Sequence, residues 1–132
     1  MNTGHSEGFN TYVKGYASHT EGYYTTASGS YSHAEGKNTI ATHQSQHVFG
    51  EYNTLDASTA TTGRGNYIEI VGNGVNASTT SNARTLDWDG NETISGILTD
   101  INGKQSNRHY GGLSKDEWET LSAEERMKLI SK

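Results

Sequence analysis

The chain of 132 residues contains no cysteine, so it has neither a disulfide framework nor a thiolate metal site. It has no apolar run approaching the roughly 20 residues of a membrane-spanning helix, and no secretory signal peptide is visible. Its formal net charge of −5 is opposite in sign to that of most nucleic-acid-binding surfaces. We therefore expect no membrane insertion and no nucleic-acid partner.

Sequence motifs of catalysis are absent as well. The chain has no Gly-x-Ser-x-Gly nucleophile elbow, no phosphate-binding loop, no His-Glu-x-x-His zinc motif and no cysteine nucleophile. Asp87 and Asp89 flank Trp88 and form a potential carboxylate pair, but beside a turn such residues more often stabilise the turn. We therefore predict a protein that is not an enzyme and binds no cofactor.

The most regular feature of the sequence is an internal repeat of fourteen residues. Its four copies share His at the first position and Gly at the fourth: His5–Gly8, His19–Gly22, His33–Gly36 and His47–Gly50. The period is too short for a helix–turn–helix repeat, which takes about 33 to 47 residues. It suffices for two short strands joined by tight turns, for which the recurring Gly supplies the backbone conformation. The repeat predicts a β-solenoid with equivalent residues stacked about 4.8 Å apart.

The apolar core of this predicted solenoid is thin. Val13, Ala27 and Ala41 form one apolar column, with Ala34 and Val48 across the coil. Because each repeat buries surface only against its neighbours, three or four such coils are not expected to be stable alone. We therefore expect an obligate homo-oligomer, most simply a homotrimer.

The repeat resembles sequences of known families. Ser32-His-Ala-Glu-Gly36 and Thr25-Thr-Ala-Ser-Gly-Ser-Tyr31 are similar to the head repeats of trimeric autotransporter adhesins. They are still more similar to the SHAEG repeats of tail-fibre and tail-spike proteins in phages and prophages of Gram-positive bacteria. The resemblance covers residues 1 to about 54, and residues 70–74 and 81–91 resemble the segment that follows such repeats. His43 and Phe49 depart from the pattern, and we expect the solenoid to end after Gly50, where the repeat is lost.

The resemblance implies a left-handed parallel β-roll in which three chains share one core. It also implies a phage tail-fibre module in the virion, outside the cell, that contributes to host-surface recognition. Its partners would be the other chains of the homotrimer, other tail proteins, and a bacterial cell-surface glycan or another surface receptor. One alternative is the head of a bacterial trimeric adhesin on the bacterial cell surface. Others are a fragment next to a self-cleaving chaperone domain of a tail spike and a structural shaft without a ligand. Since Met1 is followed at once by a repeat, we expect a fragment of a longer protein.

Beyond the repeats, the sequence predicts short β-elements. Tyr67–Val71 is the most strand-like run in the chain, and Gly72–Gly74 follows it with turn residues. Asp89-Gly90 predicts a hairpin that joins residues 84–88 to residues 92–97. We interpret residues 55–104 as a β-rich neck that follows the β-roll head repeats of residues 1–54.

The last residues, 105–132, predict a linker and two short helices. Ser114–Glu117 and Ser122–Glu125 each match a capping box, in which the first side chain and the fourth bond each other's backbone N–H groups. The fold class expected for the whole chain is therefore all-β, with a small C-terminal helical pair.

The four repeated histidines, His5, His19, His33 and His47, are the first candidates for a site. The first three have a Glu two residues later, and residues two apart on a strand share one face. A metal site is one interpretation, but we favour a structural ladder of hydrogen bonds and charge pairs, and predict no metal site. The remaining His43 and His109 have no equivalently spaced partners and are expected on the surface.

Four tyrosines within the repeats, Tyr16, Tyr23, Tyr24 and Tyr31, are candidate ligand-binding residues. Exposed aromatic rings surrounded by Asn, Ser and Thr suit stacking on sugar rings, and we expect these four to lie close together. The favoured alternative is that they pack in ladders between coils or cover the seam of the trimer.

Overall fold

The computed structural model describes residues 3–99 and 115–130, which are mostly β-strand. The chain divides into two compact units, residues 1–95 and residues 96–132. All ten strands of the described residues lie in the first unit, and both helices lie in the second.

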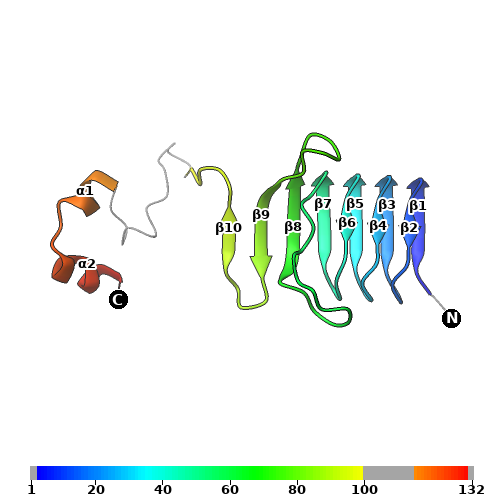
Figure 1. Ribbon diagram of the computed structural model, residues 1–132, viewed down its shortest axis with the longest axis horizontal. Helices are drawn as coiled ribbons and strands as arrows, with labels where there is room; N and C mark the ends of the chain where they lie inside the picture. The colour runs from blue at the N-terminus through cyan, green and yellow to red at the C-terminus, as the bar shows by residue number, and fades with distance from the viewer. Residues whose placement is uncertain (1–2, 100–114, 131–132) are drawn as a thin grey trace. The chain divides into compact units, whose positions relative to one another are not determined.

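Each repeat forms a five-residue strand, and the first three copies continue into a two-residue strand (Figure 1). The long strands pair in parallel in one sheet, and the short strands pair in parallel in a second. The register places His5 opposite His19, His19 opposite His33 and His33 opposite His47. The prediction of a mostly β chain with a solenoid is confirmed, with three pairs of long and short strands. The strands are β1 (His5–Phe9), β2 (Tyr12–Val13), β3 (His19–Tyr23), β4 (Thr26–Ala27), β5 (His33–Lys37), β6 (Ile40–Ala41) and β7 (His47–Glu51).

The interior of the solenoid is narrow and partly polar. Its fully buried hydrophobic side chains are those of Ala27, Ala34, Ala41, Val48 and Ile70. Buried hydroxyl groups accompany them and bond to carbonyl groups of the turns: the Ser18 hydroxyl donates to the Gly15 carbonyl oxygen at 2.8 Å, and Ser32 repeats this bond to Gly29. Since the hydroxyls of Ser18 and Ser32 are satisfied in this way, the narrow core tolerates them.

The long-strand sheet continues beyond the repeats. β8 (Tyr67–Asn73) pairs in parallel with β7, with Ile70 opposite Val48 and Gly72 opposite Gly50. The long-strand sheet therefore continues beyond Gly50, where the repeat is lost, although no further short strand follows β6 in the described residues. The loop of residues 52–66 lengthens the connection, so the fourteen-residue period disappears although the next strand keeps the register.

Two antiparallel strands complete the first unit. β9 (Asn82–Asp87) pairs with β8, and β10 (Glu92–Ile94) pairs with β9 across the turn that contains Gly90. The predicted strand at Tyr67–Val71 and the predicted hairpin are confirmed. The sheet order is β1-β3-β5-β7-β8-β9-β10 (Figure 1).

A side chain closes the open edge of the short-strand sheet at β6. In the earlier coils, a backbone amide bonds to the carbonyl thirteen residues later, as from Tyr12 to Thr25 and from Thr26 to Thr39. Ile40 also bonds to the residue thirteen positions later, but to the side chain of Asn53. The Ile40 amide donates to Asn53 Oδ1 at 2.9 Å, and Asn53 Nδ2 donates to the Ile40 carbonyl oxygen at 3.2 Å. The Asn53 amide thus takes the place of the next strand.

Gln46 and Asp56 form a second buried polar contact at this end of the solenoid. Gln46 Oε1 accepts a hydrogen bond from the Thr42 amide, and its Nε2 donates to Asp56 Oδ2 at 3.0 Å. The same carboxylate oxygen accepts from the backbone amides of Asn66 and Tyr67. These bonds tie the loop of residues 52–66 to the last coil.

The second unit contains α1 (Lys115–Glu119) and α2 (Ala123–Ile130). α1 is little more than one turn long, so α2 is the only helix of any length in the described residues. Its capping box is confirmed: the Glu125 amide donates to Ser122 Oγ at 3.2 Å, and the Ser122 amide donates to Glu125 Oε1 at 3.1 Å. Ser114, which begins the other predicted capping box, lies outside the described residues. Within residues 3–99 and 115–130, no helix has the length and apolar character to cross a membrane.

Candidate functional site

The repeated histidines and glutamates form a ladder on one face of the long-strand sheet. The side chains before and after Thr20 and Ala34 point away from the core, because alternate residues of a strand face opposite sides. The rings of His19 and His33 stack with centroids 4.5 Å apart, and those of His33 and His47 stack at 4.8 Å. The structure therefore brings the predicted histidine column together.

The glutamates bridge successive histidines of this ladder. Glu21 lies 3.2 Å from Nε2 of His33, and Glu35 lies 2.9 Å from Nε2 of His47. The hydrogen bond from His47 is the main reason that the pKa of Glu35 lies below its usual value. The predicted hydrogen bonds of the ladder are confirmed at these positions.

The four candidate tyrosines were expected to lie close together, but the structure separates them. Tyr24 follows the end of β3, whereas Tyr16 precedes its start, and a five-residue strand of about 17 Å separates the two turns. Ring contacts join Tyr23 to Tyr24 and Tyr16 to Tyr31, so the four residues form two pairs. The sequence did not separate them because the repeat alone does not show which turn each tyrosine occupies.

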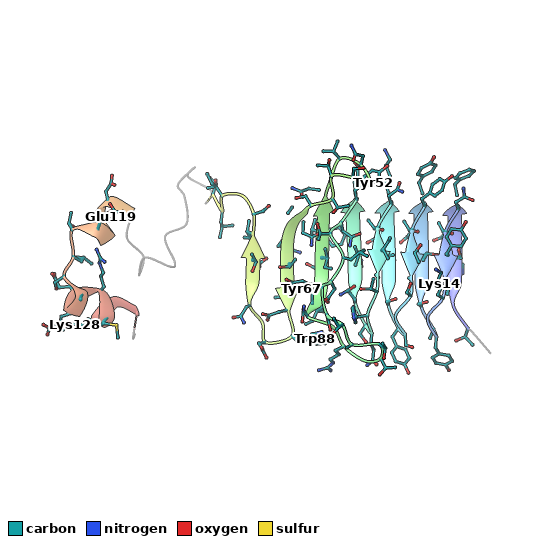
Figure 2. All side chains as sticks on the ribbon, viewed as in Figure 1. Lys14, Tyr52, Tyr67, Trp88, Glu119 and Lys128 are labelled. Atoms are coloured by element: carbon teal, nitrogen blue, oxygen red, sulfur yellow. The ribbon has the colours of Figure 1, made fainter. Side chains whose placement is uncertain are left out.

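An aromatic edge runs along the turns that follow the long strands. Phe9 lies opposite Tyr23 in the strand register, and their rings stack with centroids 5.4 Å apart and an interplanar angle of 11°. Tyr24 contacts both rings. Further along, the Lys37 ammonium lies 5.6 Å from the centre of the Tyr52 ring, and Tyr52 is labelled at this edge in Figure 2. We call Phe9, Tyr23, Tyr24, Lys37 and Tyr52 the aromatic edge.

The sequence interpretation missed Phe9, Lys37 and Tyr52. A signal was present, because Phe9, Tyr23 and Lys37 all directly follow the Gly of their repeat. Phe9, Tyr23 and Tyr24 are 57%, 46% and 40% exposed, so their rings remain accessible to a ligand in this structure.

A pocket of about 260 Å³ adjoins the aromatic edge. Asn38 and Tyr52 line it from the turns, and Asn53, Leu55 and Thr80 line it from the following segments. It combines an aromatic ring and apolar groups with amide and hydroxyl groups, a lining typical of small-molecule sites.

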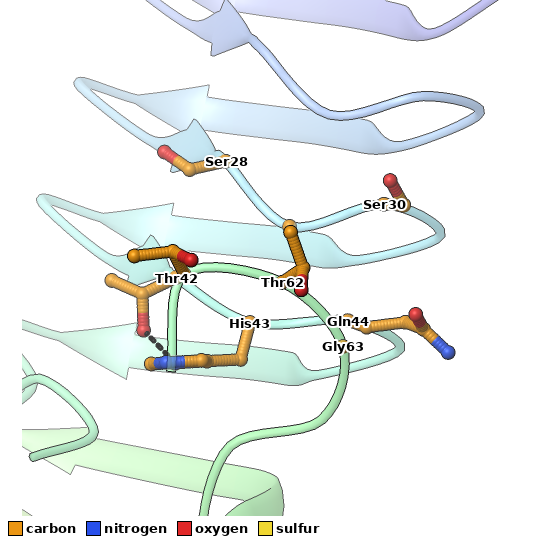
Figure 3. A pocket seen from close by; sticks show the side chains of 9 residues that line it. Ser28, Ser30, Thr42, His43, Gln44, Thr62 and Gly63 are labelled. Atoms are coloured by element: carbon orange, nitrogen blue, oxygen red, sulfur yellow. Dashed lines mark hydrogen bonds between the residues drawn. The ribbon is translucent and has the colours of Figure 1, made fainter. Parts of the chain in front are cut away.

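A second pocket, of about 220 Å³, lies at the opposite turns (Figure 3). His43 is one of its lining residues, and the expectation that His43 is exposed is wrong, because only 7% of it is accessible. The loop that includes Gly63 and Gly65 covers this histidine. His109, the other isolated histidine, lies outside the described residues.

The arrangement around His43 differs from a catalytic triad. Its Nε2 lies 3.1 Å from the Ala60 carbonyl oxygen, which only accepts, so this nitrogen carries the proton. Thr42 Oγ1 lies 2.7 Å from Nδ1, and the Asp56 carboxylate lies 4.0 Å from the same nitrogen. A triad places the nucleophile and the carboxylate on different nitrogens. His43 therefore fits a structural role that holds the loop on the last coil.

Asp87 stabilises the turn between β9 and β10. Its Oδ1 accepts hydrogen bonds from the amides of Asp89 and Asn91 at 2.9 and 2.8 Å, and its Oδ2 accepts from Asn91 Nδ2. The bond from the Asn91 amide is the largest cause of the lowered pKa of Asp87. The prediction that this carboxylate serves the turn is confirmed.

No family model, curated protein or solved structure matches this chain. The geometry of its surfaces is therefore the main basis for a functional conclusion.

Proposed function

We propose that this chain is a non-enzymatic module of a trimeric phage tail fibre that contributes to host attachment by binding a cell-surface saccharide. The resemblance of its repeats to SHAEG repeats supports this assignment, and the β-solenoid is compatible with it. The proposal includes coils of fourteen residues in a left-handed β-roll and a core shared by three chains. It also includes an extracellular location in the virion, beside other tail proteins.

The exposed rings of the aromatic edge are the main observation in support of saccharide binding. The exposed rings of Phe9, Tyr23 and Tyr24 offer apolar faces against which the C–H face of a sugar ring packs. Strand pairing holds these residues on adjacent coils, so little conformational entropy is lost when a ligand binds.

Polar groups for sugar hydroxyls lie along the same edge. Asn10 and Asn38 occupy turn positions equivalent to those of Tyr24 and Tyr52, and all four have positive φ values. Asn38 also lines the pocket of about 260 Å³ next to Tyr52. An oligosaccharide extended along the solenoid would meet aromatic and amide side chains on successive turns.

The test is binding of the full chain to immobilised cell-wall glycans of Gram-positive bacteria. Replacement Tyr23→Ala removes the central ring of the edge and is expected to weaken binding at least tenfold, about 1.4 kcal/mol. Tyr16→Ala is the matched control, because Tyr16 is similarly exposed but belongs to the opposite turns.

Equal loss of binding in both variants would contradict the assignment to the aromatic edge. Absence of binding to every glycan by the wild-type chain would contradict saccharide recognition itself.

A further inference from the structure

The histidine–glutamate ladder contains three groups with the ligand atoms of a metal site. Each group consists of two histidines from successive repeats and the glutamate between them, with one ligand atom per side chain. Within each group, these atoms lie within 4.8 Å of one another. The groups are His5–Glu7–His19, His19–Glu21–His33 and His33–Glu35–His47.

The three groups cannot all be occupied at once through these atoms. The middle group shares His19 with the first and His33 with the third, and each histidine offers one nitrogen. The first and third groups share no residue. The largest number of ions that this face can hold with complete three-residue groups is therefore two per chain.

We propose that this face binds two divalent transition-metal ions per chain, one at His5, Glu7 and His19 and one at His33, Glu35 and His47. Imidazole nitrogen and carboxylate oxygen are ligands that zinc and cobalt accept. Two histidines and one carboxylate leave a fourth position for water, as in zinc sites with three protein ligands. The proposal does not depend on saccharide binding.

Coordination of an ion requires the ligand side chains to move closer together. In the tetrahedral geometry usual for zinc, with bonds of about 2.0–2.2 Å, two ligand atoms of one ion lie about 3.3–3.6 Å apart. Ligand atoms that are now up to 4.8 Å apart therefore approach by up to about 1.5 Å. The side chains of His33, Glu35 and His47 are about one third exposed, which leaves them room to move.

One buried histidine nitrogen of the ladder lacks a hydrogen-bond partner. His19 Nε2 is buried and has no hydrogen-bond partner, since the nearest carboxylate oxygen, that of Glu7, is 3.6 Å away. Such a nitrogen is costly to leave unpaired. Coordination of an ion in the first group would give it a partner and would draw Glu7 towards it.

The test is calorimetric titration of the untagged full chain with Zn²⁺ alone, supported by the visible spectrum of bound Co²⁺. Two Zn²⁺ per chain are expected, while Mg²⁺ gives no comparable heat, because it prefers oxygen ligands. No binding of Zn²⁺ would overturn the proposal.

Glutamine variants, which replace the charged carboxylate with a neutral amide, test which groups are used. Glu21→Gln alters only the middle group, so binding of two ions is expected to persist. The double variant Glu7→Gln/Glu35→Gln alters the first and third groups and leaves the middle one, so binding is expected to fall to one ion per chain. Circular dichroism of each variant checks that the fold is retained.

Two results would contradict the assignment. One is an unchanged stoichiometry of two in the double variant, which would place the ions elsewhere. The other is loss of binding in Glu21→Gln alone, which would place a single ion in the middle group.

Discussion

At the scale of single residues, the side chain of Asn53, and not a further strand, pairs with the edge of the short-strand sheet. A sheet edge presents unpaired N–H and C=O groups, which favour association with other chains. The side-chain amide of Asn53 has one acceptor and two donor hydrogens, and it bonds to both backbone groups of Ile40. A second bond from Nδ2 to the Thr54 carbonyl oxygen fixes its orientation.

The variant Asn53→Ala is expected to destabilise the solenoid by about 2 kcal/mol, because the Ile40 backbone groups lose their partner. Chemical denaturation followed by circular dichroism, at one fixed protein concentration, measures this change. Asn73→Ala is the control, because the side chain of Asn73 is exposed at the end of β8, and its effect should stay within about 0.5 kcal/mol. Equal losses of stability in the two variants would refute the role assigned to Asn53.

Local contacts also explain why His43 stands at the repeat position that Gly15 and Gly29 occupy in the earlier coils. A Cβ atom at Gly15 or Gly29 would lie 2.0–2.1 Å from a carbonyl oxygen of the next coil. Over His43 there is no further short-strand coil, and the loop there leaves space for a side chain. Gly65 lies against the imidazole, since a Cβ atom at Gly65 would be 2.6 Å from His43 Cγ.

At the scale of elements, the glycines that end the histidine segments set the spacing of the coils. Gly8, Gly22, Gly36 and Gly50 have φ values between +97° and +110°. A Cβ atom at Gly36 would lie 2.2 Å from the carbonyl oxygen of Gly50 in the next coil. This position, the fourth residue of each long strand, therefore requires glycine both for its backbone conformation and for the close approach of successive coils.

The variants Gly36→Ala and Gly90→Ala separate these two requirements. Gly90 has a φ of +87°, but no atom beyond its chain neighbours lies within 4 Å of the position of an added Cβ atom. Gly90→Ala is expected to cost about 1 kcal/mol of backbone strain, whereas Gly36→Ala should cost about 3 kcal/mol or more, because the coils must also move apart. Thermal and chemical denaturation of both variants provides the comparison, and similar losses would argue against close coil contact as the reason for glycine.

The elements that the sequence predicted are those with a local signal. The repeat predicted the strands, Asp89-Gly90 predicted the hairpin, and Ser122 with Glu125 predicted the start of α2. The continuation of the sheet through β8 was not predicted, because the loop of residues 52–66 breaks the period between Gly50 and Gly72. The position of β8 depends on its pairing with β7, which is distant in the sequence, and no local sequence pattern indicates this pairing.

The candidate site was predicted only in part for the same reason. The histidine ladder follows from the repeat, because parallel pairing in register stacks equivalent residues. The burial of His43 depends on contacts with residues 60–65, and the pocket beside Tyr52 depends on Leu55 and Thr80. These contacts join segments with no shared sequence pattern.

At the scale of the whole molecule, the small core is the main argument for association. Three of the five fully buried hydrophobic residues among the described residues are alanines, whose burial contributes little apolar area. Large side chains outside the aromatic edge, such as those of Tyr12 and Tyr31, remain exposed in the single chain. A repeat protein with few coils also has few interfaces between repeats to stabilise it. We therefore expect the folded solenoid to be one part of a homotrimer.

The solution mass of the full chain tests this account most directly. Light scattering during size-exclusion chromatography is expected to give three times the chain mass of 14.3 kDa, and the unfolding midpoint should rise with protein concentration. A folded species with the mass of one chain, and an unfolding midpoint independent of concentration, would contradict the trimeric fibre.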